Sequence, residues 1–393
     1  DRCAAAAPLF EGTATIGGAP VRVRTTLVLY RESAFRRTLP EYAAICGVPE
    51  ATIVELAREL TSHGKRAAVD AHGGTMYAGG FQGAWAAVAL NGLVGNLNWK
   101  GGTGAGGGQF KAFGEGPRYD LANIPDAPKP RGVKITRESA YEATSEYARR
   151  GRPARAPWFP FGRGLQGEVL PAALEGYPYR LEALLSIDAN PLYGAAGADA
   201  LVRDRLADPA RLPLFVAVDP FLNETSRYAD YVFPDSVMYE SWGVVGAWGG
   251  VPAKLASTRY PVVGPPSGAR TPDGDPVDAD ALLVALGAGL GLPGFGPAAI
   301  PAPDGRRLPL ARPSDWWLRA FANLAYDGEP VPDASRDDLA LTGVDRFLAA
   351  HAGTLDADEA RKVGFVLARG GRVQAPDAAY RGEWLSKRYE KPV

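Results

Sequence analysis

The stretch ALLSIDANP, residues 183–191, determines the fold that we expect for the middle of the chain. Its first five residues are a short apolar run that stops at a proline-containing turn, which is typical of a buried strand. A helix with Leu201, Val202 and Leu206 on one face follows, and the stretch LFVAVD at residues 214–219 is a second apolar run. This strand–helix–strand order has the length of a parallel crossover of about 30 residues. The pattern predicts the α/β class, with a parallel sheet and flanking helices.

The two predicted strands end in polar residues, Asn190 after the first and Asp219 after the second, and a third strand is expected over residues 231–233. In an open parallel sheet, ligands bind in the crevice outside the carboxyl ends of the strands. The residues that we expect around this crevice are Asp188, Asn190, Asp219 and Thr225.

The first hundred residues also alternate strand and helix signals. Residues 21–30 alternate and then run apolar, which predicts a strand, and helices are expected over residues 49–62 and 82–93. The apolar run at residues 67–71 predicts another buried strand, parallel to the two in the middle of the chain, which ends at the turn HGGT, residues 72–75. Its glycines allow backbone amides to approach a ligand closely.

The rest of the chain is less regular. Residues 115–178 are rich in Pro, Gly and Arg without a sustained period, so we expect a long functional loop there. A short helix is expected over residues 223–228, and longer ones near residues 279–290, 314–325 and 355–368.

Composition excludes several classes of protein. A net charge of −1 gives no indication of nucleic-acid binding. Cys3 and Cys46 are too few for a four-thiolate cluster or a cysteine-only zinc site, and two unpaired thiols are favoured over a disulfide. The longest apolar stretch, residues 281–292, is shorter than the ~18 residues that a membrane-spanning helix needs, so no membrane insertion is expected. Because the chain begins at Asp1, without a methionine or a secretory segment, we expect a processed or excised fragment.

The glycine run at residues 102–107 formally satisfies the G-x-G-x-x-G dinucleotide pattern. That pattern should follow a strand and open a helix, whereas this one follows a predicted helix and a turn. A connector is therefore the favoured interpretation over an NAD or ATP site, and amides that face another pyrophosphate are a third.

Asp219 and Thr225 leave two interpretations open. The Asp219 carboxylate suits a ribose hydroxyl or the N1/N2 edge of guanine, and Thr225 suits the cap of a helix whose positive end favours phosphate. An ordinary cap beside a solvated aspartate explains them equally well. For His72, a polar loop role is favoured over that of a proton donor, and for Asp230 and Glu240 structural hydrogen bonds are favoured over a pair of catalytic acids.

Four stretches together resemble the bis-(molybdopterin guanine dinucleotide) oxidoreductases of the dimethyl sulfoxide reductase type. They are AHGGTMYAGG at residues 71–80, LNGLVGNLNWKGG at 90–102, DANP at 188–191, and DPFLNETSRYADYVFPDSVMYESWG at 219–243. The last contains the spaced pattern D…T…AD-x-V-x-P…E-x-x-G, which is long and specific, and the resemblance covers residues 21–290 well.

The resemblance implies molybdenum bis-(molybdopterin guanine dinucleotide) as cofactor. The residues that it assigns to cofactor contact are Gly73, Gly74, Thr75, Asp188, Asn190, Pro191, Asp219 and Thr225. Asp219 or Asp188 is expected to accept hydrogen bonds from the guanine, and the glycine turn is expected to approach a pterin or phosphate through its backbone. No catalytic residue and no metal ligand is identified.

Two features of the family are missing, namely the amino-terminal cysteine motif of a [4Fe–4S] cluster and the carboxyl-terminal barrel. The resemblance therefore implies a middle segment made of three parts. Residues 1–100 are expected to be the later part of one cofactor-binding α/β domain, residues 101–260 a second α/β domain with the guanine dinucleotide crevice, and residues 261–393 helical and irregular return segments.

For the intact protein, the resemblance implies anaerobic respiration in the periplasm, with two-electron reduction of tetrathionate to thiosulfate. The implied partners are an iron–sulfur electron-transfer subunit, a quinol-oxidising membrane subunit, and a small sulfur oxyanion as the substrate. Reduction of arsenate, selenate, polysulfide or thiosulfate is the alternative within the family. A free-standing nucleotide-binding α/β protein and a scaffold domain without ligand are the alternatives outside it.

Overall fold

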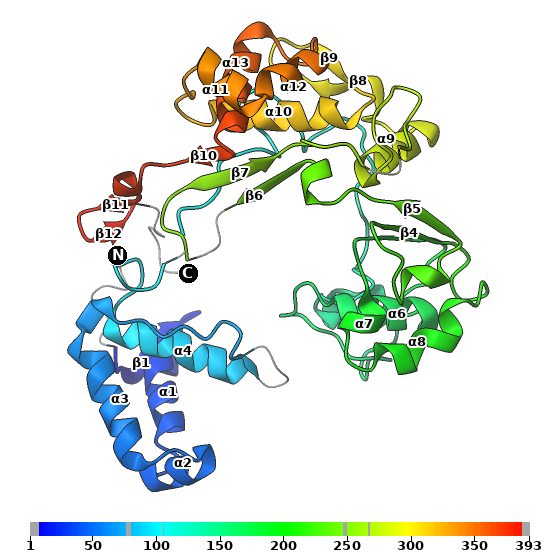
Figure 1. The fold of residues 1–393 in the computed structure, drawn as a ribbon. Helices are drawn as coiled ribbons and strands as arrows, with labels where there is room; N and C mark the ends of the chain where they lie inside the picture. Colours follow the sequence, from blue (N-terminus) through cyan, green and yellow to red (C-terminus); the bar gives the residue numbers. More distant parts are fainter. Residues whose placement is uncertain (1–7, 76–79, 105, 247–249, 266–267, 387–393) are drawn as a thin grey trace. The chain divides into compact units, whose positions relative to one another are not determined.

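The computed structural model describes residues 8–75, 80–104, 106–246, 250–265 and 268–386 (Figure 1). Cys3 and the side chain of Leu201 lie outside the described part of the chain. The chain divides into two units, of which the first contains residues 1–105 and 380–393 and the second contains residues 106–379.

The first unit consists mostly of helices. Its elements are β1 (Glu11–Ile16), β2 (Ala19–Arg24), α1 (Thr26–Ala34), α2 (Leu39–Cys46), α3 (Glu50–Ser62), η1 (Gly64–Arg66), α4 (Gly80–Val94), β11 (Tyr380–Arg381) and β12 (Trp384–Leu385). Both strand pairs are antiparallel hairpins. The helices predicted over residues 49–62 and 82–93 are confirmed as α3 and α4.

One strand prediction in this unit is confirmed only in part, and another is wrong. Residues 21–30 form a strand only as far as Arg24, because the chain turns at Thr25, whose hydroxyl donates to the Pro8 carbonyl, and then enters α1. Residues 67–71 form no strand. Instead, the Asn91 side chain of α4 accepts from the Val69 amide at 2.9 Å and donates to the Val69 carbonyl at 2.8 Å, so a side chain takes the place of a neighbouring strand.

The second unit contains a three-stranded parallel sheet. Its strands β3 (Leu184–Ile187), β4 (Phe215–Asp219) and β5 (Tyr231–Pro234) lie in that order, with Leu184 opposite Phe215 and Val216 opposite Tyr231. The predicted parallel crossover is therefore confirmed.

Short helices cover one face of this sheet. They are α6 (Val169–Glu175), α7 (Pro191–Gly194) and α8 (Ala198–Leu206), and Figure 1 shows all three on the same side of β4. Their apolar side chains, among them Leu170, Leu192 and Val202, pack against Phe215 of β4. This packing fixes the loops at the carboxyl ends of the strands.

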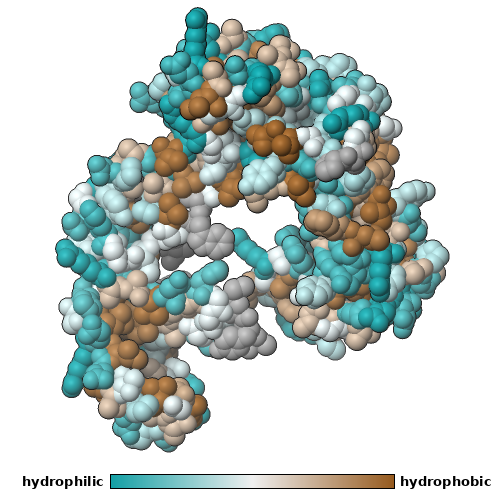
Figure 2. All heavy atoms as spheres, in the orientation of Figure 1, coloured by the Kyte–Doolittle hydropathy of each residue, from teal (hydrophilic) through white to brown (hydrophobic). Residues whose placement is uncertain are grey.

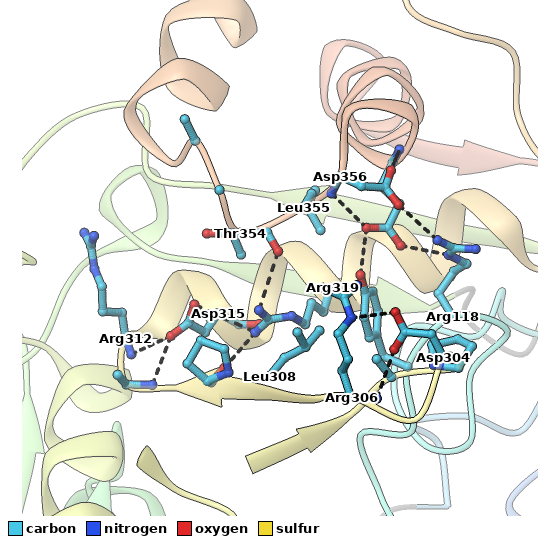
Figure 3. Close-up of a pocket in the computed structure, with 18 residues that line it drawn as sticks. Arg118, Asp304, Arg306, Leu308, Arg312, Asp315, Arg319, Thr354, Leu355 and Asp356 are labelled. Atoms are coloured by element: carbon cyan, nitrogen blue, oxygen red, sulfur yellow. Dashed lines mark hydrogen bonds and ion pairs between the residues drawn. The ribbon is translucent and has the colours of Figure 1, made fainter. Parts of the chain in front are cut away.

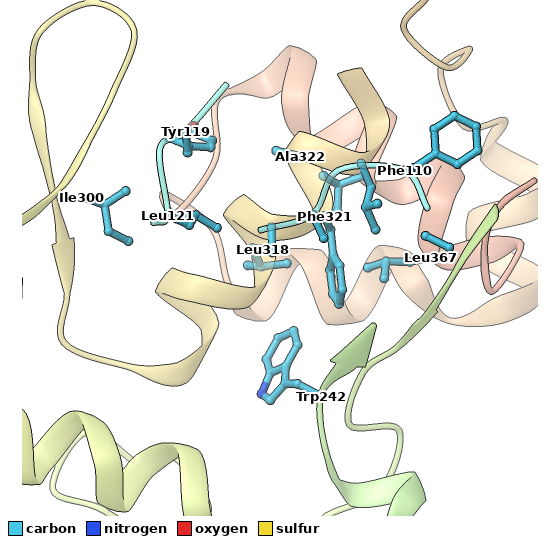
Figure 4. Packing of buried hydrophobic residues seen from close by; sticks show 14 of the residues in the cluster. Phe110, Tyr119, Leu121, Trp242, Ile300, Leu318, Phe321, Ala322 and Leu367 are labelled. Atoms are coloured by element: carbon cyan, nitrogen blue, oxygen red, sulfur yellow. The ribbon is translucent and has the colours of Figure 1, made fainter. Parts of the chain in front are cut away.

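A second core belongs to the later part of this unit. It is centred on α10 (Pro313–Tyr326), whose Leu318 and Phe321 are fully buried and, with Trp242 and Leu367, point into one cluster (Figure 4). The other elements there are β6 (Gly243–Gly246), β7 (Leu255–Arg259), α9 (Ala279–Gly289), β8 (Gly296–Pro301), β9 (Arg307–Leu310), α11 (Arg336–Thr342), α12 (Val344–Ala350), α13 (Ala357–Ala368), β10 (Gly371–Val373) and η6 (Pro376–Ala379). The predicted helices near residues 279–290, 314–325 and 355–368 are confirmed.

The segment predicted as a long loop, residues 115–178, carries short helical elements within mostly irregular chain. They are η2 (Tyr141–Ala143), α5 (Ser145–Arg150), η3 (Gln166–Glu168) and α6. Overall, the described chain has a mixed α/β fold in which the parallel arrangement is found in the β3–β4–β5 sheet, whereas the other pairings are antiparallel.

Candidate functional site

Each strand of the parallel sheet ends in a carboxylate. Asp188 follows β3, Asp219 is the last residue of β4, and Asp235 follows β5. The ladder extends to these residues, because the Asp188 amide donates to the Val218 carbonyl at 3.0 Å and the Asp235 amide donates to the Asp219 carbonyl at 3.3 Å. Three acidic side chains therefore share the carboxyl edge of one sheet.

The Asp188 backbone has a φ of +49°, in the left-handed region where Asp and Asn are the favoured residues after glycine. Partial burial raises the pKa of the Asp188 carboxyl, and the negative charges of Asp235 and Asp219 raise it further, while Arg259 opposes the shift. A carboxylate among other carboxylates gains from a neutral or positive hydrogen-bond donor and repels a second anion.

Asn190 and Thr225 connect the loop after β3 to the loop after β4. Thr225 is 1% exposed, and its hydroxyl donates to Asn190 Oδ1 at 2.9 Å and accepts from the Leu192 amide at 3.0 Å. Asn190 Nδ2 in turn donates to Glu224 Oε2 at 2.6 Å. The two residues predicted from different strand ends are therefore in direct contact.

The predicted capping role of Thr225 is wrong. Its side chain makes no capping bond, because its hydroxyl is used by Asn190 and Leu192, and the predicted helix over residues 223–228 is only the three-residue turn η4 (Ser226–Tyr228). Asn223 takes the capping role instead, since its Oδ1 accepts from the amides of Thr225 and Ser226 at 2.9 Å each. The sequence signal was present, because Asn is among the preferred capping residues.

A cavity of about 510 Å³ runs along β3 to the carboxyl end of that strand, where Asp188, Asn190, Pro191 and Thr225 are among its lining residues. Asp219 is not among them. Its carboxylate accepts from the Phe221 amide at 3.0 Å and from Asn223 Nδ2 at 2.8 Å, so it organises the following turn. Of the two carboxylates that the sequence left open, Asp188 is the one that faces the cavity.

Gly73, Gly74 and Thr75 lie in the first unit, in the turn that follows the chain held by Asn91. Gly73 has a φ of +82°, which favours glycine, and Thr75 Oγ1 donates to the Ala71 carbonyl at 3.0 Å. His72, Gly73 and Gly74 in this turn are exposed, and Thr75 is half-buried.

The described part of the glycine run is neither strand nor helix, in agreement with a connector. A Cβ atom at Gly102 would lie 2.2 Å from the Asn96 carbonyl oxygen, so this glycine allows a close approach of two backbone segments. The structural interpretation of Asp230 and Glu240 is likewise met, because Asp230 accepts from the Phe215 amide at 2.7 Å and Glu240 accepts from the Val237 amide at 2.9 Å.

A second cavity, of about 670 Å³, lies against α10 (Figure 3). Its charged side chains form a network that the sequence did not reveal: Arg118 pairs with Glu359 at 2.8 Å, and Arg306 pairs with Asp304 at 2.6 Å. Arg319 is 1% exposed and donates to the carbonyls of Pro309 and Asp315, and burial lowers its pKa. Because these charges are matched within the fold, we assign this cavity a structural role.

Other kinds of site find no support among the described residues. No group of His, Cys, Asp and Glu side chains there is arranged to hold a metal ion. No helix in the described ranges combines the length and apolar character that crossing a membrane requires.

Comparison with known proteins places the chain in the molybdopterin oxidoreductase family, although no protein-family model matches it. This family implies a molybdenum–pterin cofactor. The chain is 45% identical over 384 residues to a tetrathionate reductase subunit of Salmonella typhimurium, and the match covers 96% of this chain and 38% of that protein.

Two further relatives match over almost the whole chain. A selenate reductase subunit of Mesobacillus selenatarsenatis is 33% identical over 94% of this chain and 36% of its own length. A tetrathionate reductase subunit of Archaeoglobus fulgidus is 30% identical over 96% and 35%. The chain therefore spans little more than a third of the length of these relatives.

Proposed function

We propose that the carboxyl edge of the β3–β4–β5 sheet binds the nucleoside end of a molybdopterin guanine dinucleotide. The observation that carries this proposal is the Asp188 carboxyl, which lines the cavity among acidic neighbours and has a raised pKa. Guanine offers N1–H and N2–H donors side by side, and a ribose offers hydroxyl donors. Either group can donate to the Asp188 carboxylate, whose acidic neighbours disfavour a second anion.

We assign only the nucleoside of the cofactor to this edge, because three carboxylates repel an anionic group such as the diphosphate. Independently of that edge, the turn of Gly73, Gly74 and Thr75 in the first unit has the chemistry that suits a phosphate or a pterin, since backbone amides of a glycine turn can donate to an acceptor. In this proposal, Asn190 and Pro191 shape the wall of the nucleoside cavity, while Thr225 and Asp219 hold the loops that form it.

For the full-length protein, we propose reduction of tetrathionate to thiosulfate. One tetrathionate ion accepts two electrons, its central sulfur–sulfur bond breaks, and two thiosulfate ions leave. The molybdenum–pterin group supplies this redox chemistry when bound, and the protein binds and orients the group. Support comes from the 45% identity to one tetrathionate reductase protein and from the second tetrathionate reductase among the relatives.

The remaining parts of the assembly are proposals by the same similarity. We propose a [4Fe–4S] cluster in the amino-terminal part of the full-length protein, electron delivery from a quinol-oxidising membrane subunit through an iron–sulfur subunit, and a periplasmic location. The division into residues 1–100, 101–260 and 261–393 also stays a proposal. Selenate is the alternative substrate, because one relative that matches 94% of the chain is a selenate reductase subunit.

The substrate proposal is tested with the full-length protein and a chemical electron donor. Oxidation of reduced methyl viologen is followed with tetrathionate, thiosulfate, selenate or arsenate as acceptor. We expect kcat/KM for tetrathionate to exceed that for selenate at least tenfold. A preference for selenate or arsenate contradicts the tetrathionate assignment and leaves the cofactor site intact as a proposal.

A further inference from the structure

Positive charge is concentrated in one stretch of the chain, residues 129–163, which we name the basic segment. It contains nine Lys and Arg residues but only three Glu residues and no Asp, whereas the whole chain has a net charge of −1. Seven of the nine basic residues are arginines. Such a local excess of one sign attracts a surface of the opposite sign.

The basic segment has little regular structure, yet buried polar contacts hold its shape. Arg137 is almost fully buried, its Nε donates to the Pro157 carbonyl at 2.7 Å, and its carbonyl accepts from the Phe159 amide at 2.9 Å. Trp158 Nε1 donates to the Tyr177 hydroxyl at 3.0 Å. The outer side chains are therefore presented from a defined backbone, which lowers the entropy cost of binding.

Most of the basic side chains point outward. The exposed ones are Lys129, Arg131, Lys134, Arg149, Arg150, Arg152, Arg155 and Arg163. Only Lys134, Arg150 and Arg152 of these form an ion pair with a residue that the structure describes, so Lys129, Arg131, Arg149, Arg155 and Arg163 do not. Their charge is consequently available to a partner.

Two hollows and one exposed ring also belong to the basic segment. Arg131 and Lys134 line a cavity of about 460 Å³, and Arg152 and Arg155 line another of about 440 Å³. Phe161 is 91% exposed, although a ring of that size is normally covered. Arginine and aromatic side chains are the types that contribute most to binding at protein interfaces.

We propose that the basic segment is a docking surface for an acidic surface stretch of a separate protein. Carboxylates of the partner pair with Arg131, Arg149 and Arg163, which form no ion pair within the described chain, and an apolar side chain of the partner covers Phe161. This proposal does not depend on the proposed cofactor or substrate, because none of its residues belongs to the site at the sheet edge.

A nucleic acid fits this surface less well. Single strands bind where successive aromatic rings offer open faces for stacking. Here the ring of Trp158 packs against Tyr141 and Tyr177, with centroid distances of 5.6 and 6.3 Å. A bilayer fits less well too, because the helix in this segment, α5, has only six residues and no extended apolar face.

The test uses the full-length protein and a fluorescein-labelled peptide of alternating glutamate and leucine, with a glutamine–leucine peptide as control. We expect the acidic peptide to bind, and its affinity to fall as NaCl rises from about 50 to about 300 mM. The variant Arg131→Gln/Arg149→Gln/Arg163→Gln should weaken binding about tenfold, since each lost contact costs about 0.5 kcal/mol. The matched variant Arg307→Gln/Arg336→Gln/Arg346→Gln removes the same charge from exposed positions outside the segment and should change binding less than twofold.

Each of the other outcomes contradicts the proposal. No binding of the acidic peptide, or equal loss in both triple variants, shows that the segment is not the docking surface. Tighter binding of an oligothymidine or of phosphatidylglycerol vesicles shows a different class of partner. Binding by the 393-residue chain but not by the full-length protein shows that the rest of the same polypeptide covers this surface.

Discussion

The helices α4 and α10 have similar lengths but differ in how much of their surface is buried. In α4 the sequence is apolar on every side and includes no ionisable residue, yet Phe81 is 64% exposed and Trp85 and Val88 are exposed as well. In α10 the sequence is amphipathic, with Asp315 and Arg319, and eleven of its fourteen residues are buried. An apolar sequence thus predicts that a helix is covered, but whether it is covered depends on the chain that packs around it.

The two helices also share a structural feature. Each presents a buried asparagine to a stretch of irregular chain, Asn91 of α4 to Val69 and Asn323 of α10 to Tyr119. Figure 2 shows apolar surface over the helical first unit. Since the relatives are more than twice as long as this chain, we propose that further chain covers α4 in the full-length protein.

The largest difference between the two helices is expected from removing a phenyl ring. Phe321→Ala in α10 leaves a cavity in a fully buried cluster and should lower the free energy of unfolding by about 3–5 kcal/mol. Phe81→Ala in α4 removes an exposed ring and should cost less than about 0.5 kcal/mol. Urea denaturation of the isolated chain measures both, and equal losses contradict the contrast.

The asparagines provide a finer comparison. Asn323 accepts from the amides of Arg118 and Tyr119 and donates to the carbonyls of Ala112 and Tyr119, all within 3.1 Å. Asn323→Ala leaves these buried backbone groups without hydrogen-bond partners and should lower the free energy of unfolding by about 3 kcal/mol. Asn91→Ala should lower it by about 1–2 kcal/mol. Hydrogen exchange should then rise at residues 112–119 in the first variant and at residues 67–71 in the second. Unchanged exchange at both stretches contradicts the clamping role.

The region around α10 contains ionisable groups and α4 contains none, so the pH dependence of stability should differ between the two. Burial raises the pKa of Asp278 to about 6 against the hydrogen bond from the Ala281 amide, and the carboxylates of Asp280, Asp235 and Asp275 add to the rise. The folded state therefore binds more protons than the unfolded state between pH of about 4 and 6, so stability falls as pH rises through this window.

Asp278→Asn keeps the helix cap and removes this dependence. We expect the variant to be about 1–2 kcal/mol more stable than the parent at pH 7.5 and equally stable near pH 4. Thermal unfolding at the two pH values measures the difference. A variant that is less stable at pH 7.5 shows that the ionised carboxylate stabilises the fold.

The smallest effect on stability, below about 0.5 kcal/mol, is expected on the exposed face of α4. Phe81→Gln/Trp85→Gln/Val88→Gln should instead reduce self-association of the isolated chain, because the stripe that these residues form is the apolar surface available to a second copy. Sedimentation velocity over a range of concentrations measures this, with Glu55→Gln on α3 as the control. Association that persists in the triple variant shows that another surface drives it.

The sequence predicted elements whose partners lie nearby in the chain. The parallel pair β3–β4 and helices α3, α9, α10 and α13 follow from local periodicity, which needs no knowledge of distant contacts. The failed strand at residues 67–71 shows the limit of this reasoning. Its apolar run is real, but a side chain from α4 satisfies its backbone, and no local pattern reveals such a partner.

The candidate site divides in the same way. The strand-end positions of Asp188, Asn190 and Asp219 were predictable, because they follow from where apolar runs stop. The orientation of each carboxylate was not, since it depends on turn amides such as that of Phe221. Nor was the burial of Arg319, which depends on carbonyls brought together from separate segments.

The guanine nucleotide content of the full-length protein tests the central claim most directly. Acid hydrolysis releases GMP from a guanine dinucleotide cofactor, and the same sample gives molybdenum by elemental analysis. We predict about two GMP for each molybdenum atom in the parent protein. Asp188→Asn should lower both contents about tenfold or more, because a charged hydrogen bond of about 1.5–3 kcal/mol is lost, while the exposed control Asp204→Asn should retain them. Molybdenum without GMP, or full cofactor content in Asp188→Asn, contradicts the assignment of the sheet edge as the guanine site.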